Sequence, residues 1–316
     1  MAKKKIPSIV KKIQTQIVPS LDYSIDRALS HSQLTIHDTC PFRWKLQYKD
    51  KLKPFSDSMS SVFGKAIHEV IQKYLEVMYG VSKAKADNID IEEMFKDKFK
   101  SEYQASYKKN KNIHFSDPAE MSEYCEEGME ILKYFKRNVS TYFMKRGWHF
   151  LGYELPINYT PLSEYKTIKY IGYLDLVFYN EFDEHIKIVD IKTSNKAWGK
   201  WQKEDKLKMS QLVLYKKFFA EMYDIPVKNV DIEYFIVKRK LWEESDFPQK
   251  RIQLHVPPSG TTTIKNSMLY VTDFIKEVYE TSGKVKEKKF MKKPSENNCR
   301  FCPFRDSPEI CDKSLF

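Results

Sequence analysis

Hydrophobic residues recur at helical spacing in the first half of the chain. Within residues 61–79 the apolar positions follow one another at intervals of three and four, which predicts an amphipathic helix. Charged segments with helical character continue through residues 81–147. Among them Asp117 is a candidate N-cap, because Pro118 follows at the first helical position and Glu120 at the third. We therefore expect residues 81–147 to form a helical insertion.

After Trp148 the pattern changes to short runs that are rich in β-branched and aromatic residues. Three runs follow one another, then a helical stretch, two further runs and a second helical stretch. The predicted strands are 148–157, 167–179, 184–193, 230–238 and 251–256, and the predicted helices are 203–222 and 262–281. Strands interspersed with helices predict an α/β fold in which a mixed sheet is covered on both faces.

Two of the predicted strands carry charges inside an apolar run. Asp190 and Lys192 interrupt one run, and their spacing of two places both on one face. A buried carboxylate or ammonium is costly unless it has a partner, so a simple ion pair on an edge strand is one explanation. Asp175 interrupts another run in the same way, and two acids need more than one lysine. If the strands are neighbours, Asp175 and Asp190 converge on a hard divalent cation beside Lys192.

Other polar residues stand at suggestive positions, although each also has a purely structural explanation. His68 lies on the first predicted helix with Gly64 one turn earlier, where the missing side chain lets another element approach closely. A lone helical histidine is usually structural. Gln211 and Tyr215 share one face of the helix that follows the strands, and Glu154 lies in a strand-like run where an exposed acid is ordinary.

Taken in chain order, four motifs resemble the RecB-like branch of the PD-(D/E)xK nuclease family. They are Gly64-x-x-x-His68, Gly172-Tyr173-Leu174-Asp175, Asp190-Ile191-Lys192 and Gln211-x-x-x-Tyr215. Their order, spacing and placement on strands and helices agree over residues 30–316. The resemblance implies a restriction-endonuclease-like mixed sheet flanked by helices. It also implies cleavage of DNA phosphodiesters that depends on one or two divalent metal ions.

The resemblance further implies a role for each matching residue. The ligands of Mg²⁺ or Mn²⁺ would be the side chains of His68, Asp175 and Asp190 together with the carbonyl of Ile191. An imidazole ligand suits Mn²⁺. Lys192 would hold the attacking water, help to deprotonate it and stabilise the charge that builds on the phosphate.

Three more residues complete the expected catalytic set. Gln211 and Tyr215 would orient Lys192 or the substrate, and Glu154 is a further catalytic candidate. A phosphodiester is anionic and repels hydroxide, so hydrolysis benefits from a cation and an ammonium held next to it.

Four of the five cysteines form a pattern of possible ligands. Cys299, Cys302 and Cys311 lie close together near the C-terminus, and Cys40 lies far upstream. Ligation is favoured over disulfides in a cytosolic enzyme. The arrangement resembles the iron–sulfur variant of these nucleases, found among CRISPR-associated and phage exonucleases, in which four such cysteines hold a 4Fe-4S cluster. The interval of eight residues before Cys311 is longer than usual there, and a structural Zn²⁺ site with the same ligands is the alternative; Cys125 is expected to be an ordinary free thiol.

Composition narrows the class of protein. The chain has 316 residues, with 54 Lys and Arg against 43 Asp and Glu, and a net charge of +11. Such a charge suits an anionic partner. The nine glycines form neither a dinucleotide-binding motif nor a P-loop. No apolar run is long enough for a membrane span or a secretory signal, so we expect a cytoplasmic protein with no membrane partner.

The chain is expected to consist of a basic tail and one nuclease domain. Residues 1–22 include five lysines and are expected to be a solvated tail, with a phosphate-seeking arm or an organellar transit peptide as alternatives. Residues 23–316 would form the domain, including the insertion 81–147 and a cysteine segment at 296–316.

A loop behind the predicted catalytic strand is the candidate nucleic-acid interface. Lys196, Trp198, Lys200 and Trp201 alternate basic and aromatic side chains there. Lysines can follow phosphates while rings stack on bases, which suits single-stranded DNA or free DNA ends. A solvated, partly packed loop is the alternative. A second, weaker patch lies at residues 238–242.

These observations favour a metal-dependent deoxyribonuclease. By resemblance it is expected to be an exonuclease of recombination, repair or phage DNA metabolism, in a bacterial, archaeal or phage-infected cell and with a helicase or recombination protein as a possible partner. One alternative is a non-catalytic DNA-binding or scaffold subunit of a helicase–nuclease complex. Another is a small-molecule metalloenzyme, which the basic charge opposes.

Overall fold

The computed structural model describes residues 7–52, 54–242 and 247–312, and its centre is two mixed sheets. A three-stranded sheet has the order β1-β4-β3, and a five-stranded sheet has the order β2-β5-β6-β7-β8. The strands are β1 (Arg27–Leu29), β2 (Trp148–Gly152), β3 (Leu155–Tyr159), β4 (Ile168–Leu174), β5 (Leu176–Asn180), β6 (His185–Ser194), β7 (Val230–Lys238) and β8 (Ile252–His255). The pairs β1–β4 and β6–β7 are parallel, and the other pairs are antiparallel. The expected mixed α/β architecture is confirmed.

Two predicted strands are each broken into two. The run 148–157 divides into β2 and β3, and the run 167–179 divides into β4 and β5, so the chain passes from one sheet to the other at each break. Gly152 (φ 149°) and Glu154 (φ 50°) make the first bend with positive backbone angles. The second break falls at Asp175. The prediction of single continuous strands is therefore wrong at both places.

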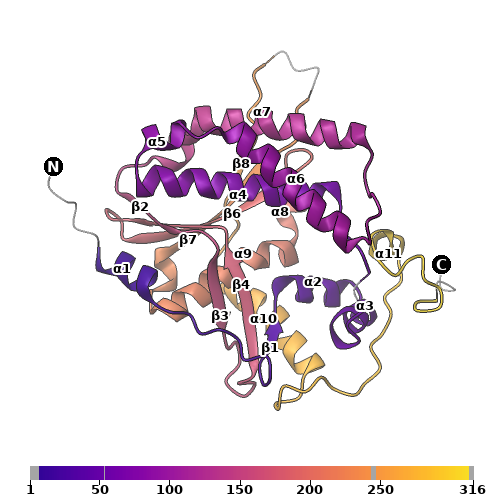
Figure 1. Ribbon diagram of the computed structural model, residues 1–316. Helices are drawn as coiled ribbons and strands as arrows, with labels where there is room; N and C mark the ends of the chain where they lie inside the picture. Colours follow the sequence, from indigo (N-terminus) through magenta and orange to yellow (C-terminus); the bar gives the residue numbers. More distant parts are fainter. Residues whose placement is uncertain (1–6, 53, 243–246, 313–316) are drawn as a thin grey trace.

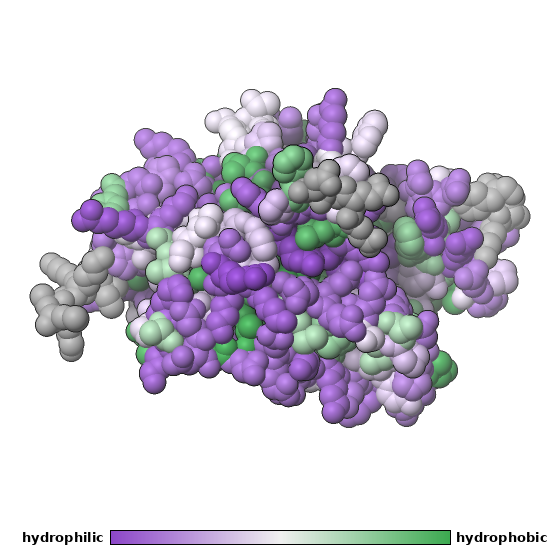
Figure 2. All heavy atoms as spheres, turned by 90° about the horizontal axis from the view of Figure 1, so that it is seen from above, coloured by the Kyte–Doolittle hydropathy of each residue, from purple (hydrophilic) through white to green (hydrophobic). Residues whose placement is uncertain are grey.

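Long helices cover one face of the five-stranded sheet. They are α4 (Met59–Gly80), α5 (Lys83–Asp87), α6 (Ile91–Lys109) and α7 (Pro118–Phe143), and they lie together at the top of Figure 1. Their apolar side chains form one core with residues of β5, β6 and β7, including Val189 and Ile191. Helix α7 begins as expected, because Asp117 Oδ1 accepts a hydrogen bond from the Glu120 amide at 2.8 Å. The face above these helices is largely hydrophilic, with only scattered apolar side chains (Figure 2).

The second core lies on the opposite face of the sheet. It is built around α9 (Lys206–Tyr223), which packs against β3, β6 and β7, and α10 (Thr261–Val278), which packs against α9. The smaller elements on this side and at the chain ends are α1 (Ser8–Thr15), α2 (His31–Thr39), α3 (Pro41–Trp44), a π-turn η1 (Lys45–Lys49), α8 (Lys200–Glu204), a 3₁₀ turn η2 (Val227–Asn229) and α11 (Glu296–Arg300). In the part of the chain that the structure describes, no helix has the length and apolar character of a membrane span.

The N-terminal segment is not simply a solvated tail. Residues 1–6 lie outside the described part, but α1 buries Val10 and Ile13 in the second core. Lys12 Nζ donates a hydrogen bond to the Tyr223 carbonyl at 2.6 Å. A helix of eight residues with apolar side chains on one face is stabilised by packing that face against the core. The prediction of a solvated tail is therefore wrong for α1.

Candidate active site

The candidate site lies where the two sheets separate. Strand β5 pairs with β6 as far as Leu176 opposite Val189, and before Leu176 the chain belongs to β4 in the other sheet. The opposite edge of β6 stays paired to β7 through Asp190 and Lys192. Among the described residues, one edge of β6 therefore has no strand partner at residues 190–192. We call this opening between the sheets the notch.

Five predicted site residues meet in the notch. Asp175 Oδ2 accepts a hydrogen bond from the Ile191 amide at 2.7 Å, so the carboxylate replaces the missing strand. His68 reaches in from α4, with Nδ1 at 3.5 Å from the same Asp175 oxygen. Lys192 Nζ lies 2.8 Å from Asp190 Oδ2. The structure thus brings together acidic, imidazole and ammonium groups from α4, the β4–β5 junction and β6.

Burial and proximity set the charges of these groups. Burial and the neighbouring Asp190 carboxylate raise the pKa of Asp175 well above its usual value. Burial lowers the pKa of His68 to about 4, so the imidazole is neutral at neutral pH and has a lone pair available. Burial alone would lower the pKa of Lys192, but the carboxylates of Asp190 and Asp175 raise it. In this arrangement Lys192 is an ammonium, which favours charge stabilisation over removal of a proton from water.

Gln211 and Tyr215 line the other side of the notch on α9. Gln211 Nε2 lies 3.4 Å from the Tyr215 hydroxyl. Burial raises the pKa of Tyr215 to about 12, so the phenol stays protonated. Gly172 on β4 is needed for this approach, because a Cβ there would lie 2.7 Å from the Tyr215 hydroxyl. Gly64 on α4 has a similar function beside β6, where a Cβ would meet Thr193 Oγ1 at 3.0 Å.

Glu154 reaches the same region through a residue that sequence reasoning missed. Gln72 Nε2 donates to Glu154 Oε1 at 2.8 Å and to the Asp175 carbonyl at 3.3 Å. Gln72 follows His68 by four positions and so lies on the same helix face, a spacing visible in the sequence. His31 was also missed. His31 Nε2 lies within hydrogen-bond distance of the Leu207 carbonyl, at 2.9 Å, and of Ser210 Oγ, at 3.2 Å. Burial, and to a smaller extent the nearby Lys192 ammonium, lowers the pKa of His31 to about 4.

The chemistry of the donors in the notch fits a hard divalent cation. Carboxylates are typical ligands of both Mg²⁺ and Mn²⁺, and a neutral imidazole ligand suits Mn²⁺ better than Mg²⁺. Within the described part of the chain, the buried Asp190 Oδ2 has no hydrogen bond of ordinary geometry, although Lys192 Nζ lies 2.8 Å from it. The side chains are not yet arranged to bind a metal ion. Among the residues described, no three His, Cys, Asp or Glu side chains are grouped closely enough to hold one.

The four candidate cluster cysteines share one hollow. Cys40, Cys299, Cys302 and Cys311 line a cavity of about 590 Å³ between α2–α3 and the C-terminal segment. All are free thiols, and burial raises the pKa of Cys302 and of Cys311. Asn298 helps to hold the segment in place by donating to the Thr39 carbonyl at 3.1 Å. In the described part of the chain, these sulfurs are not yet close enough together to form a group that could hold a metal ion.

The expected DNA-stacking pair is separated by the fold. Trp201 is 88% exposed on α8, and Lys196 and Lys200 are exposed beside it. Trp198 is only 5% exposed, packs against Tyr234 and has Lys208 Nζ 3.7 Å above its ring centre. The assignment of Trp198 to base stacking is therefore wrong, because its ring belongs to the core.

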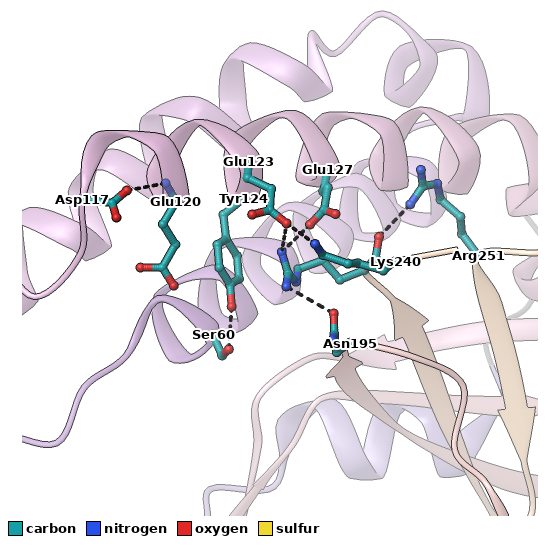
Figure 3. Close-up of polar contacts among 10 residues, drawn as sticks. Ser60, Asp117, Glu120, Glu123, Tyr124, Glu127, Asn195, Lys240 and Arg251 are labelled. Carbon is teal, nitrogen blue, oxygen red and sulfur yellow. Dashed lines mark hydrogen bonds and ion pairs between the residues drawn. The ribbon is translucent and has the colours of Figure 1, made fainter. Parts of the chain in front are cut away.

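Helix α7 is tied to the end of the strand that carries the notch residues. Arg239, just after β7, lies within 2.6 Å of Glu127 and 3.2 Å of Glu123 on α7, and also donates to Asn195 Oδ1 at 3.2 Å. Its guanidinium lies 4.1 Å from the centre of the Tyr124 ring. Figure 3 shows the two glutamates pointing from α7 toward Asn195. These contacts connect the helical layer to the segment that follows Lys192.

Comparison with known proteins agrees with this geometry. No curated protein matches the chain. The family model described as the PD-(D/E)XK nuclease superfamily matches residues 28–311, which include both sheets and the notch. Nucleases of this superfamily typically use Mg²⁺ or Mn²⁺. The chain belongs to the PD-(D/E)XK nuclease superfamily, and its restriction-endonuclease-like fold and nuclease class follow from that membership.

Proposed function

We propose that the protein is a divalent-metal-dependent deoxyribonuclease whose active site is the notch. The observation that carries the proposal is the convergence of Asp175, Asp190 and Lys192 with His68 at the uncovered edge of β6. Buried groups of like charge are costly to hold together, and they persist where a cation or a reaction needs them. A mere structural ion pair would need only one of the two acids.

His68, Asp175 and Asp190 would hold Mg²⁺ or Mn²⁺, with the Ile191 carbonyl as a further candidate ligand. When bound, the metal would neutralise phosphate oxygens and lower the pKa of a bound water. Lys192 supplies a positive charge next to the position where negative charge builds in the transition state. Tyr215 and Gln211 hold the opposite wall of the notch and so orient Lys192 or the substrate.

DNA with free ends is the proposed substrate, and exonucleolytic cleavage the proposed mode. The chain carries a net charge of +11, and exposed Trp201 with Lys196 and Lys200 stands at the end of the loop that follows β6. Phosphates can contact the lysines while a base stacks on the indole. Action in recombination, repair or phage DNA metabolism inside a cell, alone or with a helicase or recombination partner, belongs to the same proposal.

The cysteine hollow is proposed to hold a 4Fe-4S cluster. Its four thiols come from two distant parts of the chain, and Arg43, Arg300 and Arg305 also line it. Guanidinium groups offset the negative charge of a thiolate-bound cluster. Protein purified without oxygen should then be brown and contain iron. A colourless, zinc-containing preparation would establish the Cys₄ zinc alternative instead.

End-labelled linear DNA and closed circular DNA, incubated with the intact protein and Mn²⁺, test the function. Linear DNA should be degraded, circular DNA should survive, and a chelator should stop the reaction. Asp190→Asn and Lys192→Met should each lower the rate on the order of 10²-fold or more. Lys187→Met is the matched control, since Lys187 lies on the same strand but pairs with Glu233 at 2.9 Å outside the notch.

Each outcome of this assay has a definite meaning. Undiminished cleavage by the Asp190 and Lys192 variants would refute the assignment of the site. Cleavage of the circle would refute exonuclease action while leaving the nuclease intact. DNA binding without any metal-dependent cleavage would favour a non-catalytic scaffold. That is the second candidate function, because the described His, Asp and Glu side chains are not yet grouped to hold a metal ion.

A further inference from the structure

Gln72 is a buried amide that joins three parts of the notch. Its side chain is almost fully enclosed, with 3% of the residue exposed. The amide nitrogen has two acceptors, Glu154 Oε1 at 2.8 Å and the Asp175 carbonyl at 3.3 Å. Gln72 also lies one helical turn after His68 on α4. One side chain therefore links the imidazole-bearing helix, the β2–β3 bend and the β4–β5 break.

The chemistry of these partners explains why an amide occupies this position. Both partners are acceptors, so the group between them must donate twice, and an amide nitrogen does this without adding charge. A buried amide without partners costs about 1–3 kcal/mol. Gln72 lies at the border between the apolar side of α4, where Leu75 is fully buried, and the polar side that carries His68 and Glu69. The two hydrogen bonds give this enclosed amide nitrogen its partners.

Glu154 is the group that needs to be held. It is exposed on the bend between β2 and β3, and its backbone has φ 50°, a left-handed conformation that non-glycine residues seldom adopt. Such strain persists where surrounding contacts fix it, and it occurs often at functional sites. Glu154, Gln72 and His68 also line one hollow of about 600 Å³ that opens to the solvent. The hydrogen bond from Gln72 holds the Glu154 carboxylate at the side of that hollow where Gln72 lies.

We propose that Gln72 is a positioning residue that fixes the Glu154 carboxylate beside Asp175, so that Glu154 takes part in binding the divalent metal. The inference rests on the proposed function and adds two residues to it. Glu154 contributes a fourth acidic or imidazole group to the ligand region, and Gln72 acts only through Glu154 and the Asp175 turn. An outer partner of this kind typically changes metal affinity by about 10–100-fold.

Metal binding without DNA tests the inference directly. Mn²⁺ affinity would be measured by titration calorimetry on the intact chain for wild type, Gln72→Met, Glu154→Gln and the double variant. Methionine keeps the volume of glutamine and loses both donors. We expect each single variant to weaken Mn²⁺ binding by about 10-fold or more, and the double variant to be no weaker than Glu154→Gln alone.

Gln33→Met is the matched control. Gln33 is also buried, with 6% of the residue exposed, and its amide donates to the Ala28 carbonyl at 2.7 Å, but its contacts lie outside the notch. It should lower the free energy of unfolding about as much as Gln72→Met and leave Mn²⁺ affinity unchanged. A merely structural Gln72 would behave like this control.

Two results would overturn the inference without touching the proposed function. One is a Gln72→Met protein with wild-type Mn²⁺ affinity. The other is a double variant whose loss equals the product of the single losses, because Gln72 would then not act through Glu154. If instead the wild-type chain neither bound Mn²⁺ nor cut DNA, the proposed function itself would fail.

Discussion

Replacing Gly172 by alanine should destabilise the protein by displacing Tyr215. A Cβ at this position would lie 2.7 Å from both Cε1 and the hydroxyl oxygen of Tyr215 and 2.9 Å from Cζ, whereas ordinary contact begins at 3.4 Å. The ring has little room to move. Tyr215 is 6% exposed and packs edge-on against Tyr170, with ring centres 6.4 Å apart. The ring must therefore shift by several tenths of an ångström or β4 must bend.

Two energies of opposite sign decide the result. Alanine in place of glycine in a strand gains about 0.5–1 kcal/mol, because the unfolded chain loses less freedom on folding. Forcing an extra methyl group into a packed site costs about 1–3 kcal/mol. The cost exceeds the gain, so the free energy of unfolding should fall by about 1–2 kcal/mol. DNA cleavage should fall as well, since Tyr215 and Gln211 form one wall of the notch.

Urea unfolding of the metal-free protein measures this change. Gly80→Ala is the matched control: a Cβ at Gly80 meets nothing within 4 Å, so this variant should be neutral or more stable by up to about 1 kcal/mol. In a Tyr215→Leu background the clash with the ring is gone, and Gly172→Ala should no longer destabilise. An equal loss in both backgrounds, or no loss in the wild-type background, would refute the reasoning.

Two further changes separate packing from DNA contact. Arg239→Met should lower the free energy of unfolding by about 1–3 kcal/mol, because the partly buried Glu127 carboxylate loses the guanidinium that links α7 to the end of β6, whereas Glu123 keeps Lys240 as a partner; unchanged urea stability would contradict this. Trp201→Ala should weaken single-stranded DNA binding by about 1–3 kcal/mol in fluorescence anisotropy and leave stability unchanged. Trp198→Ala should instead destabilise the fold by about 3–5 kcal/mol, and a reversed pattern for the two tryptophans would refute the assignment of Trp201 to the DNA interface.

The sequence was informative where local chemistry leaves few alternatives. The start of α7 follows from Asp117, Pro118 and Glu120, since each satisfies a requirement of a helix N-terminus. Asp190 and Lys192 share a face because strand alternation has no other outcome. Their convergence with Asp175 and His68 required the family motifs in addition, because alternation within one strand does not tell which strands are neighbours.

Other features depended on contacts that no local pattern contains. The runs around Glu154 and Asp175 are apolar on both sides, so their periodicity gives no sign that the chain changes sheets there. In the sequence, Trp198 has the pattern of an exposed stacking residue. In the fold, Lys208, which lies ten positions later, packs over its ring. Gln72 did carry a signal, four residues after His68, but a polar side chain at one position of an amphipathic helix is ordinarily read as surface.

Asp175 shows why the broken strand and the candidate active site are one feature. The chain leaves the five-stranded sheet at this residue, and the departure removes the strand that would have accepted the Ile191 amide. The Asp175 carboxylate accepts the hydrogen bond from the Ile191 amide instead. It therefore takes the place of the missing strand at the point where the two sheets separate. An apolar residue at 175 would leave a buried N–H unpaired and would also remove a negative charge from the notch. Asparagine at 175 would keep an acceptor for the Ile191 amide and could not carry a charge, so this substitution separates the support of the fold from the binding of a cation.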